Sequence, residues 1–452
     1  MTHPDARDET APRGRSLPGP VQNVLGHLLD PLFRHAYTLI VNTGLTSALG
    51  LVYWVIAGRL YAPEEVGRNA AMISSIMFLG GVAQLNLRPV LSRFVPVAGP
   101  SSARLVLMGY ASSTAVAIVG AAIFVASSRL WAPTGPLAAI REDGWAAFLL
   151  VAATAIWTIS ALQDGVLIGL KSTVLLTIEN VGFSIGKIVV VVALATLASQ
   201  IDFAIALSWA GPMLVAIVAV NVVIFGRLIP RHVRRNPTRD PRVNPRSLIG
   251  FAAGDYLGSL FALTYISLLP VIVISQASPV AAAHFYIVWV IVSSLQVLPA
   301  FMVISLVVDT AGDPSTFRRQ GRRMLIGMAR LVVPICLGIV VIAPLLLAAF
   351  GPSYGDATLL LRLLVLSVIP YGINMLYVGR ARLRVTAPRI VLVQAAVAIL
   401  VLGLTLLLIP VMGIDGVGVA CLVGQGSVAL VLLATALRPL LRPAPPAGAP
   451  SI

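Results

Sequence analysis

The sequence is poor in charged residues for its length. Only 11% of its 452 residues are Asp, Glu, Lys or Arg, whereas 58% are hydrophobic. A soluble domain carries about 25% charged residues. This deficit excludes an ordinary water-soluble protein, because the chain could not cover its surface with polar groups. The apolar residues instead form repeated runs, long enough for bilayer-spanning helices of about 20 residues.

Cysteine is also scarce. Cys336 and Cys421 both lie inside apolar runs, with no second Cys and no His beside them. This spacing excludes a disulfide framework and a Cys-based metal site, so we expect two small buried side chains. The net charge of +15 comes from 30 Arg and 2 Lys, which lie in short segments between apolar runs. That placement is typical of membrane proteins, and we expect no nucleic-acid partner.

Motifs of the common catalytic centres are missing. The sequence contains no HExxH, Walker or GxSxG pattern. Residues 413–418 are rich in glycine but lie between two apolar runs, so we interpret them as a tight turn. The longest expected external loop, 128–145, offers Arg141, Glu142 and Asp143, which we interpret as the solvated start of the next helix. We therefore expect a protein that is not an enzyme and has neither cofactor nor metal.

The apolar runs predict an all-α polytopic membrane protein of about twelve transmembrane helices. Helices satisfy their own backbone groups in lipid, and runs this long exclude the alternating strands of a barrel, which take about 10 residues each. We expect two six-helix bundles, a 6+6 repeat, around a central cavity. The predicted spans are 36–58, 70–92, 105–127, 146–168, 176–198, 203–225, 251–274, 284–308, 325–348, 357–379, 389–411 and 414–437.

The distribution of basic residues predicts the orientation. With the N-terminus inside, 24 Lys and Arg residues fall in cytoplasmic segments and only 4 in external ones. Positive residues concentrate on the cytoplasmic side of a membrane protein. We therefore predict a multi-pass protein of the cytoplasmic (inner) membrane with both termini in the cytoplasm.

The same pattern predicts the division of the chain. We expect a cytoplasmic tail (1–33), an N-terminal bundle (34–226), a basic linker (227–247), a C-terminal bundle (248–438) and a disordered tail (439–452). Residues 21–33 have helical spacing of apolar residues, which indicates either an interfacial helix or an extension of helix 1. The linker contains four prolines and should not form a continuous helix. A shift of 216 residues lays Pro63 over Pro279, a faint internal repeat typical of transporters.

Ionisable residues inside the predicted spans are the most informative feature. Such residues usually face a cavity or a partner, because a charge at mid-bilayer costs about 2.5–3.5 kcal/mol on insertion scales. Those near an interface can instead extend to water, and an acid can simply pair with a neighbouring base. The basic residues outnumber the acidic ones, which favours an anionic ligand. These residues are Arg88, Asp164, Lys187, Asp255, Arg330 and Arg362.

Proline occurs inside five predicted spans. We expect helices 6 to 10 to be interrupted at these residues, and broken helices often line a transport path. The residues are Pro212, Pro270, Pro299, Pro334 and Pro370.

Two segments resemble a known family. Residues 42–67, NTGLTSALGLVYWVIAGRLYAPEEVG, continue to Arg93-Phe-Val-Pro96 and are similar to the opening of polysaccharide repeat-unit flippases. In that family helix 1 ends in a small-x-Arg step, a Pro-Glu-Glu-Val-Gly-like turn follows, and helix 2 leads to an Arg-Phe-x-Pro segment. Residues 408–420, LIPVMGIDGVGVA, resemble the family's turn between helices 11 and 12. The family belongs to a superfamily that also contains multidrug extruders and the lipid II flippase.

The resemblance implies a flippase for polyprenyl-diphosphate-linked oligosaccharide, working by alternating access in cell-surface polysaccharide biosynthesis. Its partners would be this lipid-linked glycan, membrane lipid, glycosyltransferases and a polysaccharide polymerase. We expect helices 1, 2, 7 and 8 to line the cavity. Asp255 and Asp164 are candidates for ion coupling. The candidate substrate-binding residues are Lys187, Arg88, Asn42, Arg59, Arg330 and Arg362.

Other functions remain open. A cation-coupled drug or small-molecule antiporter of the same superfamily would share this topology. A membrane polysaccharide polymerase or ligase is disfavoured by the short external loops. A major-facilitator transporter would carry a Gly-x-x-x-Asp-Arg-like loop after helix 2, where this chain has LSRFVPVAG at residues 91–99.

Overall fold

We describe the protein from a computed structural model, which describes residues 31–197, 201–238, 243–310, 316–383 and 387–441. Most of the predicted helix over 21–33 lies outside these residues, as does most of the C-terminal tail. The first helix begins at Pro31, and the last described element is the short helix α18 (Arg438–Leu441).

The described chain is almost entirely helical, which confirms the predicted fold class. Eleven of its helices are long and apolar enough to cross a membrane. The predicted span 251–274 is the remaining one, and it is divided into two helices by a π-helical turn, η4 (Thr264–Leu268). The protein is therefore a multi-pass membrane protein built from helices.

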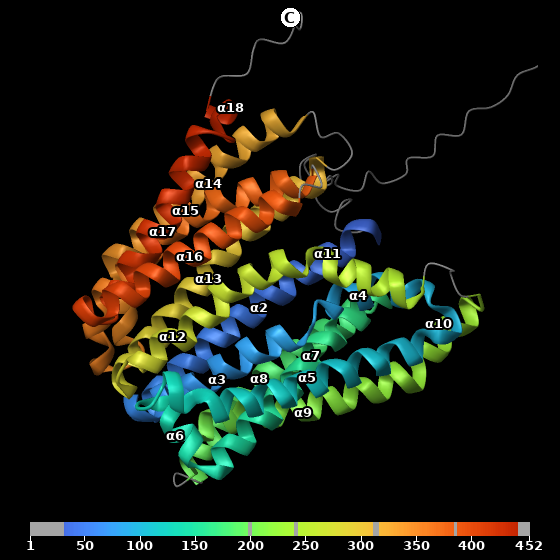
Figure 1. The fold of residues 1–452 in the computed structure, drawn as a ribbon, viewed down its shortest axis with the longest axis horizontal. Coiled ribbons are helices and arrows are strands. Elements are labelled where there is room, and N and C mark those ends of the chain that lie inside the picture. Colours follow the sequence, from blue (N-terminus) through green and yellow to red (C-terminus); the bar gives the residue numbers. More distant parts are fainter. Residues whose placement is uncertain (1–30, 198–200, 239–242, 311–315, 384–386, 442–452) are drawn as a thin grey trace, which may run out of the picture.

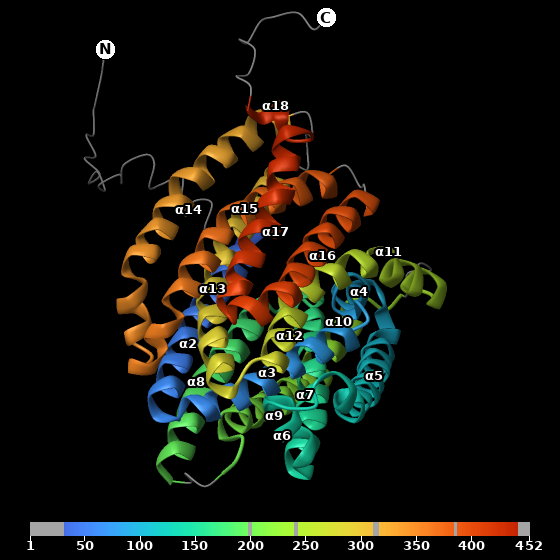
Figure 2. The ribbon, with the colours of Figure 1, turned by 60° about the vertical axis from the view of Figure 1, so that its left-hand side comes forward.

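The helices form two lobes (Figures 1 and 2). The elements of the N-terminal lobe are α2 (Pro31–Leu60), α3 (Pro63–Ala83), α4 (Leu87–Phe94), α5 (Ser102–Trp131), α6 (Pro136–Glu142), α7 (Gly144–Gly169), α8 (Thr173–Leu197), α9 (Ala204–Val223) and α10 (Ile229–Arg235). The C-terminal elements are α11 (Pro245–Leu263), α12 (Leu269–Gln276), α13 (Pro279–Thr310), α14 (Phe317–Ala348), α15 (Thr358–Leu383), α16 (Ala387–Met412), α17 (Asp415–Ala434) and α18.

The lobes lie close together at one end and diverge toward the other (Figure 1). The close end carries α6 and the start of α13, and the diverging end carries α4, α10 and α18. We call the close end the outer end, because the charge pattern predicts it to be external. α10 and α18, which adjoin segments predicted to be cytoplasmic, lie at the diverging end.

Contacts between backbones hold the outer end together. A Cβ added to Gly67 on α3 would overlap the carbonyl oxygen of Pro279 on α13. Gly58 on α2 lies against the Phe350 carbonyl in the same way, because a Cβ added to Gly58 would lie 3.0 Å from the Phe350 carbonyl oxygen. Pro63 and Pro279, which the internal repeat aligns, are the first residues of α3 and α13. The glycines allow the two lobes to approach more closely than larger residues would.

Several predicted boundaries are wrong. The predicted second span, 70–92, begins at Pro63 and breaks between α3 and α4. The start of the predicted linker is helical, because α9 continues through a π-helical turn, η3 (Ile224–Leu228), into α10. Pro230 has no N–H to donate to the preceding turn, and the π-helical turn η3 lies just before it, a local adjustment by which membrane helices accommodate proline. The predicted external loop 128–145 contains the short helix α6.

The prolines interrupt fewer helices than predicted. Pro212, Pro299, Pro334 and Pro370 lie inside continuous helices. Only at Pro270 does the predicted interruption appear, as the π-helical turn η4 just before it. Neighbouring helices and side chains in a membrane bundle can satisfy the backbone groups that a proline releases, so an unbroken helix is tolerated.

Candidate functional site

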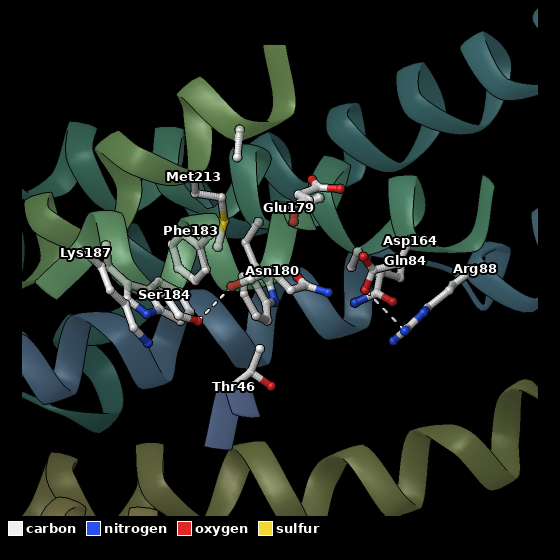
Figure 3. A pocket seen from close by; sticks show the side chains of 15 residues that line it. Thr46, Gln84, Arg88, Asp164, Glu179, Asn180, Phe183, Ser184, Lys187 and Met213 are labelled. Atoms are coloured by element: carbon white, nitrogen blue, oxygen red, sulfur yellow. Dashed lines mark hydrogen bonds and ion pairs between the residues drawn. The ribbon is translucent and has the colours of Figure 1, made fainter. Parts of the chain in front are cut away.

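A polar cavity of about 330 Å³ lies inside the N-terminal lobe. Its walls come from α2, α7, α8, α9 and the region where α3 gives way to α4. The predicted cavity lay between the bundles and was lined by helices 1, 2, 7 and 8. All the residues lining this cavity precede α10, so helices 1 and 2 contribute to it and helices 7 and 8 do not. Figure 3 shows Arg88 and Asp164 at one end of the cavity, Lys187 at the other, and Glu179 and Asn180 between them.

Lys187 projects from the middle of α8 and is only 8% exposed. Its ammonium lies 4.8 Å from the centre of the Tyr53 ring and 5.3 Å from the Phe183 ring. The Tyr53 hydroxyl donates to the carbonyl oxygen of Ile205 at 2.9 Å, which fixes this ring against α9. Among the described residues, no carboxylate lies within ion-pair distance of the Lys187 ammonium. We predicted that Lys187 faces a central cavity between the bundles; in the structure it lines this cavity of the N-terminal lobe.

Arg88 pairs with Asp164 across the cavity, at 3.2 Å between Nη2 and Oδ2. Arg88 is the second residue of α4, just after a break at Leu85 and Asn86, whose φ angles are +50° and +56°. A positive φ is uncommon outside glycine, and Asn tolerates it better than Leu. Pro89 explains the location of the break, because it has no N–H to donate to the Leu85 carbonyl in a continuous helix.

Close packing of α7 against α4 fixes this arginine. A Cβ added to Gly165 on α7 would come within 2.5 Å of the Arg88 carbonyl oxygen. Asn86 is held from the other side, since its Nδ2 donates to the Ala252 carbonyl of α11 at 3.1 Å. The break in the second span is therefore supported by neighbours on both sides, and it turns Arg88 toward Asp164.

Glu179 is a cavity residue that the sequence analysis did not identify. It lies two turns before Lys187 on α8, is 7% exposed, and its Oε2 has no hydrogen-bond partner. With Arg88, Lys187 and Asp164, it gives the cavity two basic and two acidic side chains. The expected surplus of positive charge is therefore not present in this cavity. The sequence analysis did not identify Glu179 because the predicted fifth span began at residue 176. Glu179 was therefore expected near a membrane interface rather than inside the lobe.

Aromatic and neutral polar groups complete the cavity. The indole rings of Trp157 and Trp209 are stacked with centroids 4.8 Å apart and an interplanar angle of 22°. Gly80 makes room for Trp157, because a Cβ there would approach its Cδ1 to 2.5 Å. Amide and hydroxyl groups from three different segments also line the cavity: Thr46, Gln84, Asn180 and Ser184.

Two of the predicted site residues make structural contacts instead. The Arg59 Nε donates to the Ala349 carbonyl at 2.6 Å, just beyond the end of α14, and so joins the lobes at the outer end. The Arg362 Nε donates to the Val340 carbonyl at 3.1 Å. That carbonyl would accept a hydrogen bond from residue 344 in a regular helix, but residue 344 is Pro344. In this structure neither arginine lines the polar cavity.

Asn42 and Arg330 are not among the residues that line the cavity. Asn42 is 8% exposed on α2, one turn before Thr46, and its Oδ1 has no partner. Arg330 is exposed on α14. Asp255 belongs to α11, but its side chain is outside the described part of the structure. In the described residues, no group of three or more His, Cys, Asp and Glu side chains could hold a metal ion.

Solved structures show where this architecture occurs. The lipid II flippase MurJ in an inward closed conformation has a TM-score of 0.67 and 11% identity, with 89% of this chain and 88% of that chain covered. A multidrug resistance MATE family transporter of the MOP superfamily, inward-facing, has a TM-score of 0.64 and 14% identity, with 88% and 94% covered. This chain has the fold of MOP-superfamily transporters. No protein-family model and no curated protein sequence matches it.

The MOP fold agrees with the predicted two-lobe architecture, but it does not separate the subfamilies. The outward-facing conformation of a multidrug resistance MATE transporter reaches a TM-score of 0.62 at 14% identity, with 90% and 96% covered. Flippases and drug transporters are thus similar to this chain to nearly the same degree. The substrate has to be inferred from the cavity itself.

Proposed function

We propose that this protein is a flippase that moves a polyprenyl-diphosphate-linked oligosaccharide across the cytoplasmic membrane for cell-surface polysaccharide synthesis. The observation that carries the proposal is Lys187, a buried cation with aromatic but no acidic partners among the described residues. Burying an ion costs several kcal/mol. A cation–π contact offsets about 2 kcal/mol when desolvated. An anionic ligand, such as a diphosphate, would complete this site.

The aromatic wall supports a glycan as the rest of the ligand. The faces of Trp157 and Trp209 present negative π-density, which attracts the positively polarised C–H groups of a sugar ring. The amides of Gln84 and Asn180 can donate and accept hydrogen bonds with sugar hydroxyls. A cavity that combines rings, amides and one unpaired cation is suited to a phosphorylated glycan.

Alternating access would carry the headgroup across. The lobes meet at the outer end and diverge at the predicted cytoplasmic end, so this conformation would receive its ligand from the cytoplasm. The glycan cannot cross hydrocarbon unaided, whereas its polyprenyl chain can remain in lipid. No covalent step is required. Energy would come from an ion gradient or the membrane potential, with Asp164 and Asp255 as candidates for ion coupling.

A second candidate function is a cation-coupled small-molecule antiporter of the same superfamily. Two carboxylates in the cavity favour it, since Glu179 and Asp164 could exchange a proton or a cation for a substrate. The two functions differ in cargo, and both require the cavity to be reached from each side of the membrane in turn.

Reconstituted translocation distinguishes these functions. Proteoliposomes containing the purified protein and a fluorescent polyprenyl-diphosphate-linked oligosaccharide should expose the glycan to an added glycosidase, and protein-free liposomes should not. Cation-driven efflux of a small organic cation without glycan translocation would favour the antiporter. Extension of the sugar chain by the purified protein, without translocation, would contradict the proposal in favour of a polymerase or ligase.

The cytoplasmic location of both termini remains a prediction from charge, and a single cysteine can test it. Thr238 is exposed beyond α10, whereas the native Cys336 and Cys421 are buried. We expect Thr238→Cys to react with a membrane-impermeant maleimide only after the cells are opened. Labelling of intact spheroplasts would show that the orientation is reversed.

A further inference from the structure

An apolar groove of about 540 Å³ lies beside the polar cavity, on the other face of α4. It is formed by α4, by the first turns of α5, and by α11 with the residue Val243 before it. Its walls are hydrocarbon over most of their area, with residues from α4 at positions i, i+3 and i+4. The main apolar residues are Leu87, Val90, Leu91, Leu105, Met108 and Leu248.

The groove and the cavity share one short helix. Leu87 lines the groove, and the next residue, Arg88, lines the cavity and pairs with Asp164. This division depends on the break at Leu85 and Asn86, where two residues with positive φ separate α4 from α3. Discontinuous membrane helices with strained backbone often occur at binding sites. The break thus places an apolar site and a charged site on adjacent residues.

The rim of the groove suits the headgroup end of an anionic lipid. Met108 is 60% exposed and Ile249 is 67% exposed, so large apolar side chains border the groove on its open side. Arg104 also lines it, is exposed, and forms no hydrogen bond or ion pair with the described residues. Arg104 lies in a segment predicted to be near the cytoplasmic interface, where a guanidinium can bind a lipid phosphate.

We propose that this groove holds the polyprenyl chain of the lipid-linked substrate, with Arg104 near its phosphate and the glycan in the cavity beyond α4. The proposal rests on the flippase function proposed above. A bulk phospholipid would satisfy the hydrocarbon walls equally well. The polyprenyl chain is favoured because Leu87 and Arg88, neighbours on α4, line the groove and the cavity respectively, and the rings and amides of that cavity suit a glycan.

Photo-crosslinking can test the occupant. A photoreactive amino acid replaces Met108 in the groove or, as a control, Val119, which is 57% exposed on the same helix outside the groove. The protein is reconstituted in phosphatidylethanolamine–phosphatidylglycerol vesicles that contain a small fraction of radiolabelled polyprenyl phosphate. We expect labelling at Met108 to exceed labelling at Val119 by about tenfold, which corresponds to about 1.4 kcal/mol of preference. Equal labelling at both positions would mean that bulk lipid fills the groove and would overturn the proposal.

Substitutions that fill the groove provide a second test of the proposed occupant. A Cβ on Gly109 would lie 3.6 Å from Leu91 Cδ1, so a larger side chain must enter the groove, whereas Gly120 on the same helix faces open space. Gly109→Leu should reduce Met108 labelling to the control level, and Gly120→Leu should not. Ser112→Phe, which starts from an exposed groove residue, repeats the test without a buried substitution.

Glycan translocation, measured on the same vesicles, separates this proposal from the function on which it rests. Loss of both labelling and translocation in Gly109→Leu and Ser112→Phe supports the groove as the binding site of the polyprenyl chain. Unchanged translocation in variants that no longer label would show that the groove does not bind the transported polyprenyl chain. The proposed flippase function would still stand. Enriched labelling of a wild-type protein that does not translocate the glycan would contradict the proposed flippase function. The polyprenyl chain in the groove would then not belong to a transported substrate.

Discussion

The two lobes share a helical plan but differ in what they bury. In the N-terminal lobe, Lys187 and Glu179 are both less than 9% exposed and face a polar cavity. In the C-terminal lobe, the buried polar side chains that the structure describes are amides, hydroxyls and one imidazole. They are Ser267, His284, Gln296, Thr310, Ser367, Asn374, Thr405 and Gln425.

Several buried polar side chains of the C-terminal lobe bond to one another. The Asn374 Nδ2 donates to the Gln425 Oε1 at 2.7 Å, and the Gln296 Nε2 donates to the Tyr265 hydroxyl at 3.4 Å. These neutral pairs bond to each other, as is usual for buried polar groups. Buried polar atoms without a hydrogen-bond partner occur in both lobes: the Glu179 Oε2 in the N-terminal lobe, and the Asn374 Oδ1, the His284 Nε2 and the Thr405 Oγ1 in the C-terminal lobe. Among the described residues, the buried charged side chains, Glu179 and Lys187, both lie in the N-terminal lobe, and this is why the proposed ligand site is placed there.

The largest expected effect concerns Lys187. We expect Lys187→Ala to reduce glycan translocation at least tenfold, about 1.4 kcal/mol, because it removes the unpaired cation. Protein abundance should remain normal, since the substitution also removes a buried charge. The matched control is Lys171→Ala, because Lys171 is the other lysine of the chain and is exposed. If Lys187→Ala and Lys171→Ala translocate the glycan at the same rate, the positive charge of Lys187 does not contribute to ligand binding.

The contact between the lobes should be the next most sensitive feature. Gly67→Ala places a Cβ against the Pro279 carbonyl, and overpacking of this kind costs about 1–3 kcal/mol. The outer ends should therefore separate, and the population of the conformation described here should fall. Spin labels at Arg129→Cys and Asp356→Cys, exposed residues at the outer end of each lobe, would report a longer distance. Gly182→Ala is the control, since its added Cβ meets open space; an identical distance distribution in both variants would contradict the prediction.

The membrane spans could be predicted from the sequence because each depends on a local run of apolar residues. The break in the second span could have been located as well, since Asn86 and Pro89 lie three residues apart, but a hydropathy pattern does not register it. The π-helical turns could not be found in this way. Hydropathy does not mark them, although each lies just before a proline, Pro230 or Pro270; the sequence does not show which prolines produce such a turn, since Pro212 and Pro299 lie inside continuous helices.

The cavity was predicted in part. Lys187, Arg88 and Asp164 stood out because they are charges inside apolar runs. Arg362 stood out for the same reason, and Arg59 through the resemblance to the flippase family, yet each donates to a backbone carbonyl in or just beyond α14. No pattern in the sequence shows that Pro344 leaves a carbonyl free close to α15. Whether a charged side chain faces the cavity or holds two helices together depends on contacts with residues far away in the sequence.

Arg362 allows a direct test of the structural role of charge in the C-terminal lobe. Arg362→Gln should leave the Val340 carbonyl without its donor and lower the free energy of unfolding by about 1–3 kcal/mol. Arg330→Gln on α14 should have little effect, because Arg330 is exposed. Denaturant unfolding in detergent micelles measures both. Similar stability of the two variants would contradict the structural role, and a selective loss of translocation by Arg362→Gln would return this residue to the ligand site.

The smallest expected effect on stability is that of the Arg88–Asp164 pair in the N-terminal lobe. The Arg88 side chain is 47% exposed, so solvent screens the pair, and exposed pairs contribute about 0.2–1 kcal/mol. A double-mutant cycle with Arg88→Gln and Asp164→Asn should give a coupling energy in this range for unfolding. Translocation should nevertheless fall in each single variant, because both residues line the cavity. A coupling energy of about 3 kcal/mol or more would identify the pair as a structural element. The charges of the two lobes would then serve the same purpose, and the contrast between the lobes would rest on Lys187 and Glu179 alone.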